Sequence, residues 1–230
     1  MGVDAGTGGT LSQGLIAWYA CEQASGTTTL PDQSGNNNAT LGSNGTGGAS
    51  GYSFSTGKVN NALTLNGASK GYVALPAGIL ADACEATVAT WVYLNSNPNW
   101  QRVWDFGKDE KVYMFLTTNS YTHLLRFAIT LGGNTEEHGL TAGSTLPLNE
   151  WKHVAVVLGP SGGILYVDGQ PVATDPDLAL RPADLGSTPN NYIGRSQFSA
   201  DPYLDGRIDE FRVYDRALSP LEIQALYAGP

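Results

Sequence analysis

The chain has 230 residues, including 29 Gly and 12 Pro; only 14% of its residues are charged, and its net charge is −9. Gly and Pro together make about 18% of the chain, against a usual share of about 12%, which favours many turns over long amphipathic helices. The acidic balance argues against nucleic acid and anionic membranes as partners, and no apolar run approaches the ~18 residues of a membrane span.

Short apolar stretches bounded by Gly, Asn, Asp and Pro recur along the chain. In residues 86–94, Val88, Thr90 and Val92 share one face, while Ala89 and Trp91 share the other. Regularly spaced stretches of this kind predict an all-β sandwich or barrel. The eleven expected strands are 14–21, 62–66, 72–76, 86–94, 102–107, 111–118, 123–131, 151–158, 163–169, 191–196 and 205–215.

Turn and cap signals complete the expected architecture. Asp168-Gly169 lies between two apolar runs and predicts a β-hairpin. Ser219, Pro220 and Glu222 form the pattern of a capped helix start, so one short C-terminal helix is expected over 219–227. Residues 42–57 are expected to be a long loop. No break divides the chain, and we expect a flexible lead-in at 1–10 followed by one domain at 11–230.

The sequence offers no convincing catalytic set. The three histidines lack metal-site spacing, and His153 is expected to be a core residue because it lies on a strand face with apolar neighbours. Glu136 and Glu137 lie in a polar turn and are expected to be solvated. Asp209 and Glu210 are adjacent on a strand and point to opposite faces, so they do not form an acid–base pair.

Two further features remain open from the residues alone. Cys21 and Cys84 are compatible with a disulfide or with two free thiols. The segment 30–38 (LPDQSGNNN) is dense in the oxygen ligands that Ca²⁺ prefers, but the loop taken alone favours an ordinary Asx-type turn.

Several motifs together resemble the bacterial laminin-G-like domains, which are concanavalin A-like and pentraxin-related jelly rolls. The most specific are WKHVAVV followed by LYVDG (151–169) and the closing run LDGRIDEFRVYDRALSPLEIQALY (204–227). NALTLNG (61–67), TVATWVYL (87–94) and the opening GLIAWYACEQASGTTTLPDQSGNNNATL (14–41) add to the likeness. The resemblance covers about residues 11–230. It implies an all-β, two-sheet antiparallel jelly-roll sandwich whose first and last strands lie side by side.

The resemblance also implies a structural Ca²⁺ near the chain ends. In such domains an acidic residue after the first strand and the Asp of the closing "IDEFRVY" run commonly help to hold this ion. Glu22 and Asp209 match those positions, and Asp32 and Asn37 are further candidates in the matching loop. Cys21 stands where the family usually has an aromatic residue, and this departure favours a Cys21–Cys84 bridge particular to this chain.

The family likeness implies a non-catalytic module that binds glycans or proteins, attached to secreted or surface proteins. We therefore expect a calcium-stabilised, lectin-like domain, monomeric and extracellular or at the cell surface. Trp100 and Tyr121 lie in polar turns suited to stacking on sugar rings, with Arg126 as a hydroxyl donor, although both rings would equally serve to cover the sandwich edge. The alternatives are a protein-interaction or adhesion module on the same fold and, less favoured, a sandwich-fold glycoside hydrolase or lyase.

Overall fold

A computed structural model describes residues 10–24, 26–45 and 51–229. Residues 1–9 of the expected lead-in therefore lie outside the described residues. No helix in the described part of the chain has the length and apolar character needed to cross a membrane.

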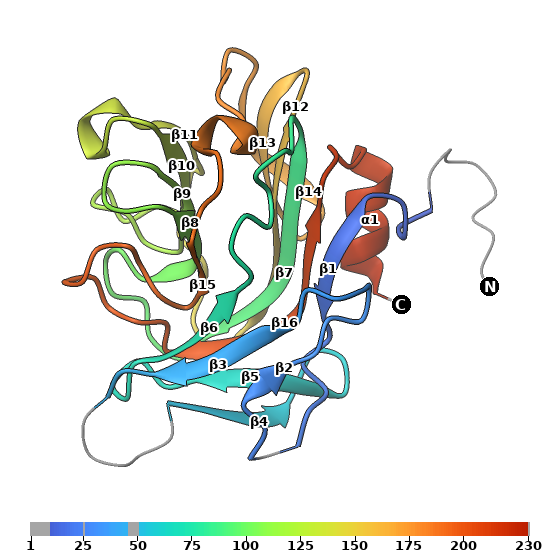
Figure 1. Cartoon of the computed structure of the whole chain (residues 1–230), viewed down its shortest axis with the longest axis vertical. Helices are drawn as coiled ribbons and strands as arrows, with labels where there is room; N and C mark the ends of the chain where they lie inside the picture. The colour runs from blue at the N-terminus through green and yellow to red at the C-terminus, as the bar shows by residue number, and fades with distance from the viewer. Residues whose placement is uncertain (1–9, 25, 46–50, 230) are drawn as a thin grey trace.

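The structure is an antiparallel β-sandwich with one α-helix, as the sequence predicted (Figure 1). The strands are β1 (Leu15–Tyr19), β2 (Thr29–Leu30), β3 (Ala39–Ser43), β4 (Tyr52–Thr56), β5 (Asn61–Leu65), β6 (Gly71–Leu75), β7 (Ala86–Leu94), β8 (Arg102–Gly107), β9 (Tyr113–Thr117), β10 (Arg126–Thr130), β11 (His138–Thr141), β12 (Trp151–Gly159), β13 (Gly162–Val167), β14 (Gln170–Asp175), β15 (Asn190–Ile193) and β16 (Gly206–Tyr214). The helices are α1 (Pro220–Ala228) and two 3₁₀ turns, η1 (Asn134–Glu136) and η2 (Pro182–Leu185).

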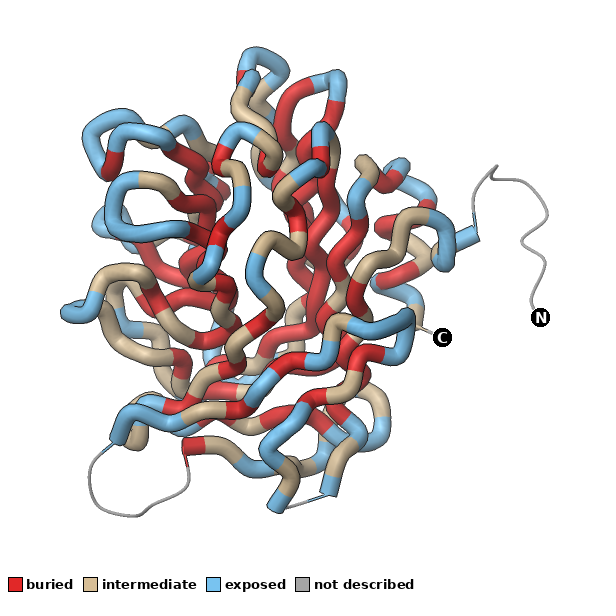
Figure 2. The backbone as a smooth tube through the Cα atoms, viewed as in Figure 1, coloured by how far each residue is buried: buried red, intermediate tan, exposed pale blue. Residues whose placement is uncertain are grey.

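Two sheets face each other across the core. The first sheet has the order β14-β13-β12-β7-β16-β5-β4, and β1 pairs with β16, so the expected contact between the first and last strands is present. The second sheet has the order β11-β10-β9-β8-β15-β6-β3-β2. Buried residues lie along the strands of both sheets, and exposed residues lie mainly in the connecting loops (Figure 2).

The alternating pattern of β7 explains how the first sheet has two buried faces. Val88 and Val92 belong to the main core between the sheets, whereas Ala89 belongs to a second cluster beneath α1. Ile223 and Leu226 of α1 complete that second cluster. The outer face of the first sheet is therefore partly covered by the helix.

Helix α1 begins as its sequence predicts. Ser219 Oγ accepts the N–H of Glu222 at 3.3 Å, and the Glu222 carboxylate accepts the N–H of Ser219 at 2.8 Å. Arg216 Nη2 also donates to Glu222 at 2.7 Å. Gly229 follows the helix with a φ of 87°, a conformation that favours glycine. The predicted helix boundaries thus hold to within one residue.

The hairpin at Asp168-Gly169 is also confirmed. Both residues have positive φ, 50° and 74°, as a type I′ turn requires, and they join β13 to β14.

The expectation of a loop over 42–57 is wrong in part. Residues 42 and 43 belong to β3, and β4 occupies 52–56, where it pairs with β5 at the edge of the first sheet. Ser55 and Thr64 join these strands through a 2.8 Å hydroxyl contact. The strand was missed because its Ser- and Thr-rich sequence lacks a clean apolar alternation.

Candidate functional site

The outer face of the second sheet carries an apolar cluster separate from the main core. Tyr113 and Phe115 alternate along β9 with core residues, so their rings lie on the outer face, where Trp100 and Phe198 pack against them. Phe198 meets the Tyr113 ring edge-on at 5.6 Å between centroids. This surface combines aromatic rings with charged groups.

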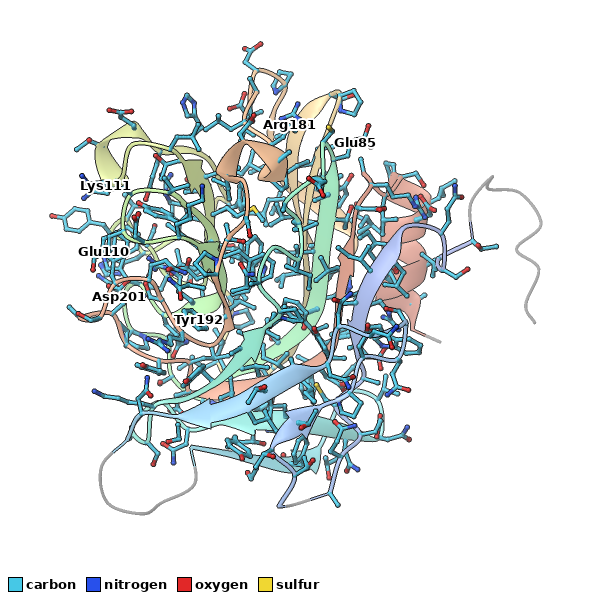
Figure 3. The ribbon with its side chains drawn as sticks, viewed as in Figure 1. Glu85, Glu110, Lys111, Arg181, Tyr192 and Asp201 are labelled. Atoms are coloured by element: carbon cyan, nitrogen blue, oxygen red, sulfur yellow. The ribbon has the colours of Figure 1, made fainter. Side chains whose placement is uncertain are left out.

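A pocket of about 370 Å³ opens beside this cluster. Its walls come from the β7–β8 connection, β8, the η1 turn and the loop after β15. Figure 3 labels Asp201 in that loop, on the same side of the sandwich as Tyr192 of β15. The lining residues are Trp100, Arg102, Asn134, Glu137, Phe198 and Asp201.

Arg102 organises one wall of the pocket. Its Nε lies 3.2 Å from Asp105 Oδ2, its Nη2 lies 3.0 Å from Asp201 Oδ2, and its Nη1 donates to the Trp100 carbonyl at 2.8 Å. The guanidinium also lies 3.9 Å from the centroid of the Phe115 ring. Arg102 thereby connects the sheet, the β7–β8 connection and the loop after β15.

The carboxyl groups beside Arg102 are desolvated. Burial raises the pKa of Asp105 to about 6, although the charge of Arg102 opposes the rise. Burial also raises the pKa of Asp201, with Arg102 and the Ser196 hydroxyl opposing it. The backbone N–H of Gln197 donates to Asp105 at 3.2 Å, so the loop after β15 is held directly to β8.

A second ion pair supports another part of the pocket wall, at Glu137. Arg126 Nη2 donates to Glu137 Oε2 at 2.6 Å, and the Tyr113 hydroxyl donates to Glu137 Oε1 at 2.7 Å. The Glu137 side chain is only 10% exposed, so the expectation that it is simply solvated is wrong. Burial, together with the neighbouring Glu137, raises the pKa of Tyr113.

Of the three sugar-contact residues expected from sequence, two lie at or behind this pocket. Trp100 lines it, and Arg126 reaches it through Glu137. Tyr121 is 79% exposed in the loop between β9 and β10 and does not line it, so its role stays a prediction. Sequence reasoning missed Arg102, Glu137 and Asp201, because only the three-dimensional packing of distant segments brings them together.

Glu22 and Asp209, the residues expected to hold a metal, both contact one segment, residues 57–61. Asp209 Oδ2 accepts the N–H groups of Lys58 and Val59, each at 2.9 Å, and Glu22 accepts the N–H of Asn61 at 3.1 Å. The Asp209 side chain is fully buried, and its Oδ1 has no hydrogen-bond partner among the described residues. Such an unsatisfied buried carboxylate oxygen fits a cation ligand.

Asp32 and Asn37 form a separate structural turn. Asp32 Oδ1 accepts the N–H groups of Trp18 at 2.9 Å and Ser34 at 2.8 Å, while Oδ2 accepts the N–H of Asn37 at 3.1 Å. Burial acts to raise the pKa of Asp32, but hydrogen bonds from Ser34, Trp18 and Asn37 outweigh it and lower the pKa. Asn37 Nδ2 donates to the Ile16 carbonyl at 2.7 Å. These residues are engaged in the turn, and their role as metal ligands stays a prediction.

The described residues contain no cluster of three or more His, Cys, Asp or Glu that would hold a metal by side chains alone. A Ca²⁺ held by Glu22 and Asp209 would therefore need backbone carbonyls or water among its ligands.

The predicted Cys21–Cys84 bridge is wrong, because the structure has both as free thiols. Cys21 is buried, and the charge of Asp209 acts on its thiol, so the two residues are close. Asp209 pairs with Trp91 in the sheet, which places Cys21 near Trp91 along β7. Cys84 is exposed just before Ala86, at the other end of β7. The five residue steps along the strand from Ala86 to Trp91 span about 16 Å, well beyond the ~7 Å Cα separation that a disulfide allows. Burial raises the pKa of the Cys21 thiol.

Comparison with known proteins agrees with this architecture. Residues 66–224 match the Concanavalin A-like lectin/glucanases superfamily. C-reactive protein of Sus scrofa is 26% identical over 172 residues, which cover 69% of this chain and 70% of that protein. The pentraxin likeness expected from the motifs is thus present in a known relative.

Solved structures share the fold at low sequence identity. Domain 4 of a GH43 extracellular arabinanase from Geobacillus stearothermophilus, in complex with arabinotriose, has a TM-score of 0.76 at 22% identity, covering 93% of this chain and 98% of that chain. Trypanosoma rangeli sialidase in complex with sialic acid has a TM-score of 0.67 at 21% identity, covering 93% of this chain but 32% of that chain. The binding domain of Paraclostridial Mosquitocidal Protein 1 has a TM-score of 0.64 at 14% identity, covering 95% and 52%.

Proposed function

The chain belongs to the concanavalin A-like lectin/glucanases superfamily, and from that premise we propose that it is a non-catalytic, calcium-stabilised carbohydrate-binding module. The observation that carries this proposal is the pocket on the outer face of the second sheet. Trp100 and Phe198 offer ring surfaces for the apolar side of a sugar, and Glu137 and Asp201 offer acceptors for its hydroxyl groups. An arabinanase domain of the same fold in complex with arabinotriose supports this choice.

The carboxylates of the pocket favour binding over hydrolysis. A glycosidase needs one free carboxylic acid and one base or nucleophile beside the scissile bond. Here Glu137 is committed to Arg126 and Tyr113, and Asp201 is committed to Arg102. His153 is only 2% exposed, and burial lowers its pKa to about 4, which supports the core role expected for it.

We propose Glu22 and Asp209 as the residues that hold Ca²⁺. The ion would neutralise a carboxylate that is otherwise costly to bury, because burial raises the pKa of Asp209 to about 7. It would also connect the end of β1 to β16 through the 57–61 segment. Chelator should then lower the melting temperature, since a ligand of the native state stabilises it by mass action. Asp209→Asn and Glu22→Ala should each abolish that shift, and an unchanged melting temperature in all three proteins would contradict the metal site.

An extracellular or cell-surface location is proposed on the same basis, because glycan ligands of such modules are found there. The alternative of a protein-interaction or adhesion module uses the same fold, and the binding domain of the mosquitocidal protein keeps it open. A glycan array separates the two, because only the carbohydrate module should bind isolated glycans.

The direct test uses that array with wild-type protein and Trp100→Ala. Binding at ~10–1000 μM is expected for a shallow site, where sugar hydroxyls replace water with little net gain. Trp100→Ala should lose this binding. Trp151→Ala is the matched control, because Trp151 is a half-buried tryptophan on the other sheet whose ring packs at a tilt against Tyr93, with 5.6 Å between ring centroids. Release of reducing sugar that depends on Glu137 or Asp201 would refute the non-catalytic assignment.

A further inference from the structure

We infer that the pocket selects neutral glycans and rejects glycans whose sugars carry carboxylate groups. This inference rests on the proposed function and names its ligand class. The charged residues that line the pocket are two carboxylates, Glu137 and Asp201, and one guanidinium, Arg102. The lining thus carries a net negative charge. Recognition of a sialic or uronic acid would instead need a free cation.

Arg102 is not such a cation. Its three guanidinium nitrogens contact Asp105, Asp201 and the Trp100 carbonyl at 3.2, 3.0 and 2.8 Å. Its side chain is 2% exposed, and one face is covered by the Phe115 ring. A sugar carboxylate would have to displace a buried carboxylate from it, leaving that group unpaired and desolvated.

Arg126 is also paired, and it does not line the pocket. Its side chain is 22% exposed, its Nη2 donates to Glu137 Oε2 at 2.6 Å, and its Nη1 is 3.4 Å from the Thr141 hydroxyl. An anion inside the pocket would therefore face the Glu137 carboxylate, which lines the wall, rather than the Arg126 guanidinium, which does not. Like charges in a partly desolvated site repel strongly, and such repulsion is an effective means of excluding a wrong ligand.

A neutral sugar meets the opposite situation. Each ionised carboxylate has about four lone-pair positions, so Glu137 and Asp201 retain acceptor capacity after their internal contacts are made. Sugar hydroxyls are donors that match these acceptors. The rings of Trp100 and Phe198 suit the apolar C–H face of the same sugar. Hydroxyl-rich, uncharged glycans fit both features.

The test compares paired glycans, of which one member is neutral and the other carries carboxylate groups. Suitable pairs are methyl-esterified and de-esterified homogalacturonan, xylan and glucuronoxylan, and lactose and sialyllactose, each measured by binding titration. For any pair that binds, the neutral member should bind at least about tenfold more tightly. Glu137→Gln removes one wall charge and releases Arg126, so it should improve binding of the acidic member relative to the neutral one. Raising the salt concentration should narrow the difference in the wild type.

Glu150→Gln is the control, because Glu150 is an exposed partner of Lys152 at 3.1 Å and its substitution changes the net charge equally away from the pocket. Glu150→Gln should leave the ratio of the affinities for the neutral and acidic glycans unchanged. If Glu137→Gln unfolds, Asp201→Asn provides the same test through Arg102. Tighter binding of the acidic member of a pair, or an affinity ratio that neither pocket variant alters, would overturn the inference but leave the proposed function standing. Failure of every pair to bind would refute the proposed function as well.

Discussion

Replacing Trp100 by alanine and by glycine separates the role of its ring from that of its backbone. Trp100 has a φ of 68°, which is unfavourable for a bulky side chain. Two hydrogen bonds hold it there, because its N–H donates to the Asn119 carbonyl at 2.6 Å and its carbonyl accepts from Arg102 at 2.8 Å. Backbone strain maintained by its surroundings is typical of functional sites.

The expected magnitudes follow from burial and from φ. The Trp100 ring is half-buried and lies 5.6 Å from the Arg102 guanidinium, so Trp100→Ala should cost about 2 kcal/mol in lost packing and cation–π attraction. Glycine avoids the ~1–2 kcal/mol penalty of the left-handed region and loses about 0.5–1 kcal/mol to chain entropy. Trp100→Gly should therefore be more stable than Trp100→Ala by about 0.5–1 kcal/mol, while both variants lose glycan binding.

Denaturant unfolding and binding titration of the same samples measure the two effects. Trp151 provides the control, since it lies within β12, where glycine should be less stable than alanine by about 0.5–1 kcal/mol. The order of the two variants should thus reverse between the sites. An alanine variant at position 100 that is as stable as the glycine variant would refute the strain argument. Glycan binding retained by either variant would refute the role of the ring.

Three further predictions concern stability and thiol chemistry. Glu222→Gln should cost about 2 kcal/mol of stability above pH 5 and little near pH 2, as measured by unfolding curves. Hydrogen bonds from Arg216 lower the pKa of Glu222 from 4.5 to about 2, so the stability that its ionised form provides is lost as the pH falls from 4.5 through about 2. A thiol reagent should label Cys84 in the native protein and Cys21 only after unfolding; protection of both, reversed by reductant, would restore the disulfide. Gly71→Ala should prevent folding, because a Cβ there would lie 1.6 Å from a backbone carbonyl oxygen, whereas Gly143→Ala, with open space around it, should melt like the wild type.

Local sequence signals predicted the parts of the fold that local chemistry controls. The capping box before α1 and the Asp168-Gly169 turn depend on residues within three positions of each other, so each was visible in the sequence. The central strands were visible because their apolar residues recur in short alternating or continuous runs bounded by turn residues. The edge strand β4 carries Ser and Thr on a half-exposed surface, and its pairing with β5 depends on tertiary context.

The site was harder to predict, because its contacts join distant segments. Trp100 was found because an aromatic residue stands out in a polar turn. Arg102 and Asp201 are 99 positions apart and meet only because β15 pairs with β8, which brings the following loop back over that strand. Glu137 looked solvated because nothing near it in the sequence indicates that β10 would bring Arg126 beside it. Strand order, which the residue pattern leaves undetermined, decides these pairs.

The placement of Arg102 also indicates why this pocket is suited to binding. Loops are usually the mobile parts of a sandwich, and ordering them on ligand capture reduces affinity. Here one buried guanidinium connects strand β8 to the Trp100 carbonyl and to Asp201 in the loop after β15, so both loops share one rigid support. The ion pairs that hold the pocket walls in place also pair both arginines with carboxylates of the protein, so neither arginine is left free to bind an anionic ligand. The rigidity of the pocket walls and the preference for uncharged sugars therefore have one structural cause. A variant that frees Arg102 or Arg126 from its carboxylate partner should alter the rigidity and the preference together.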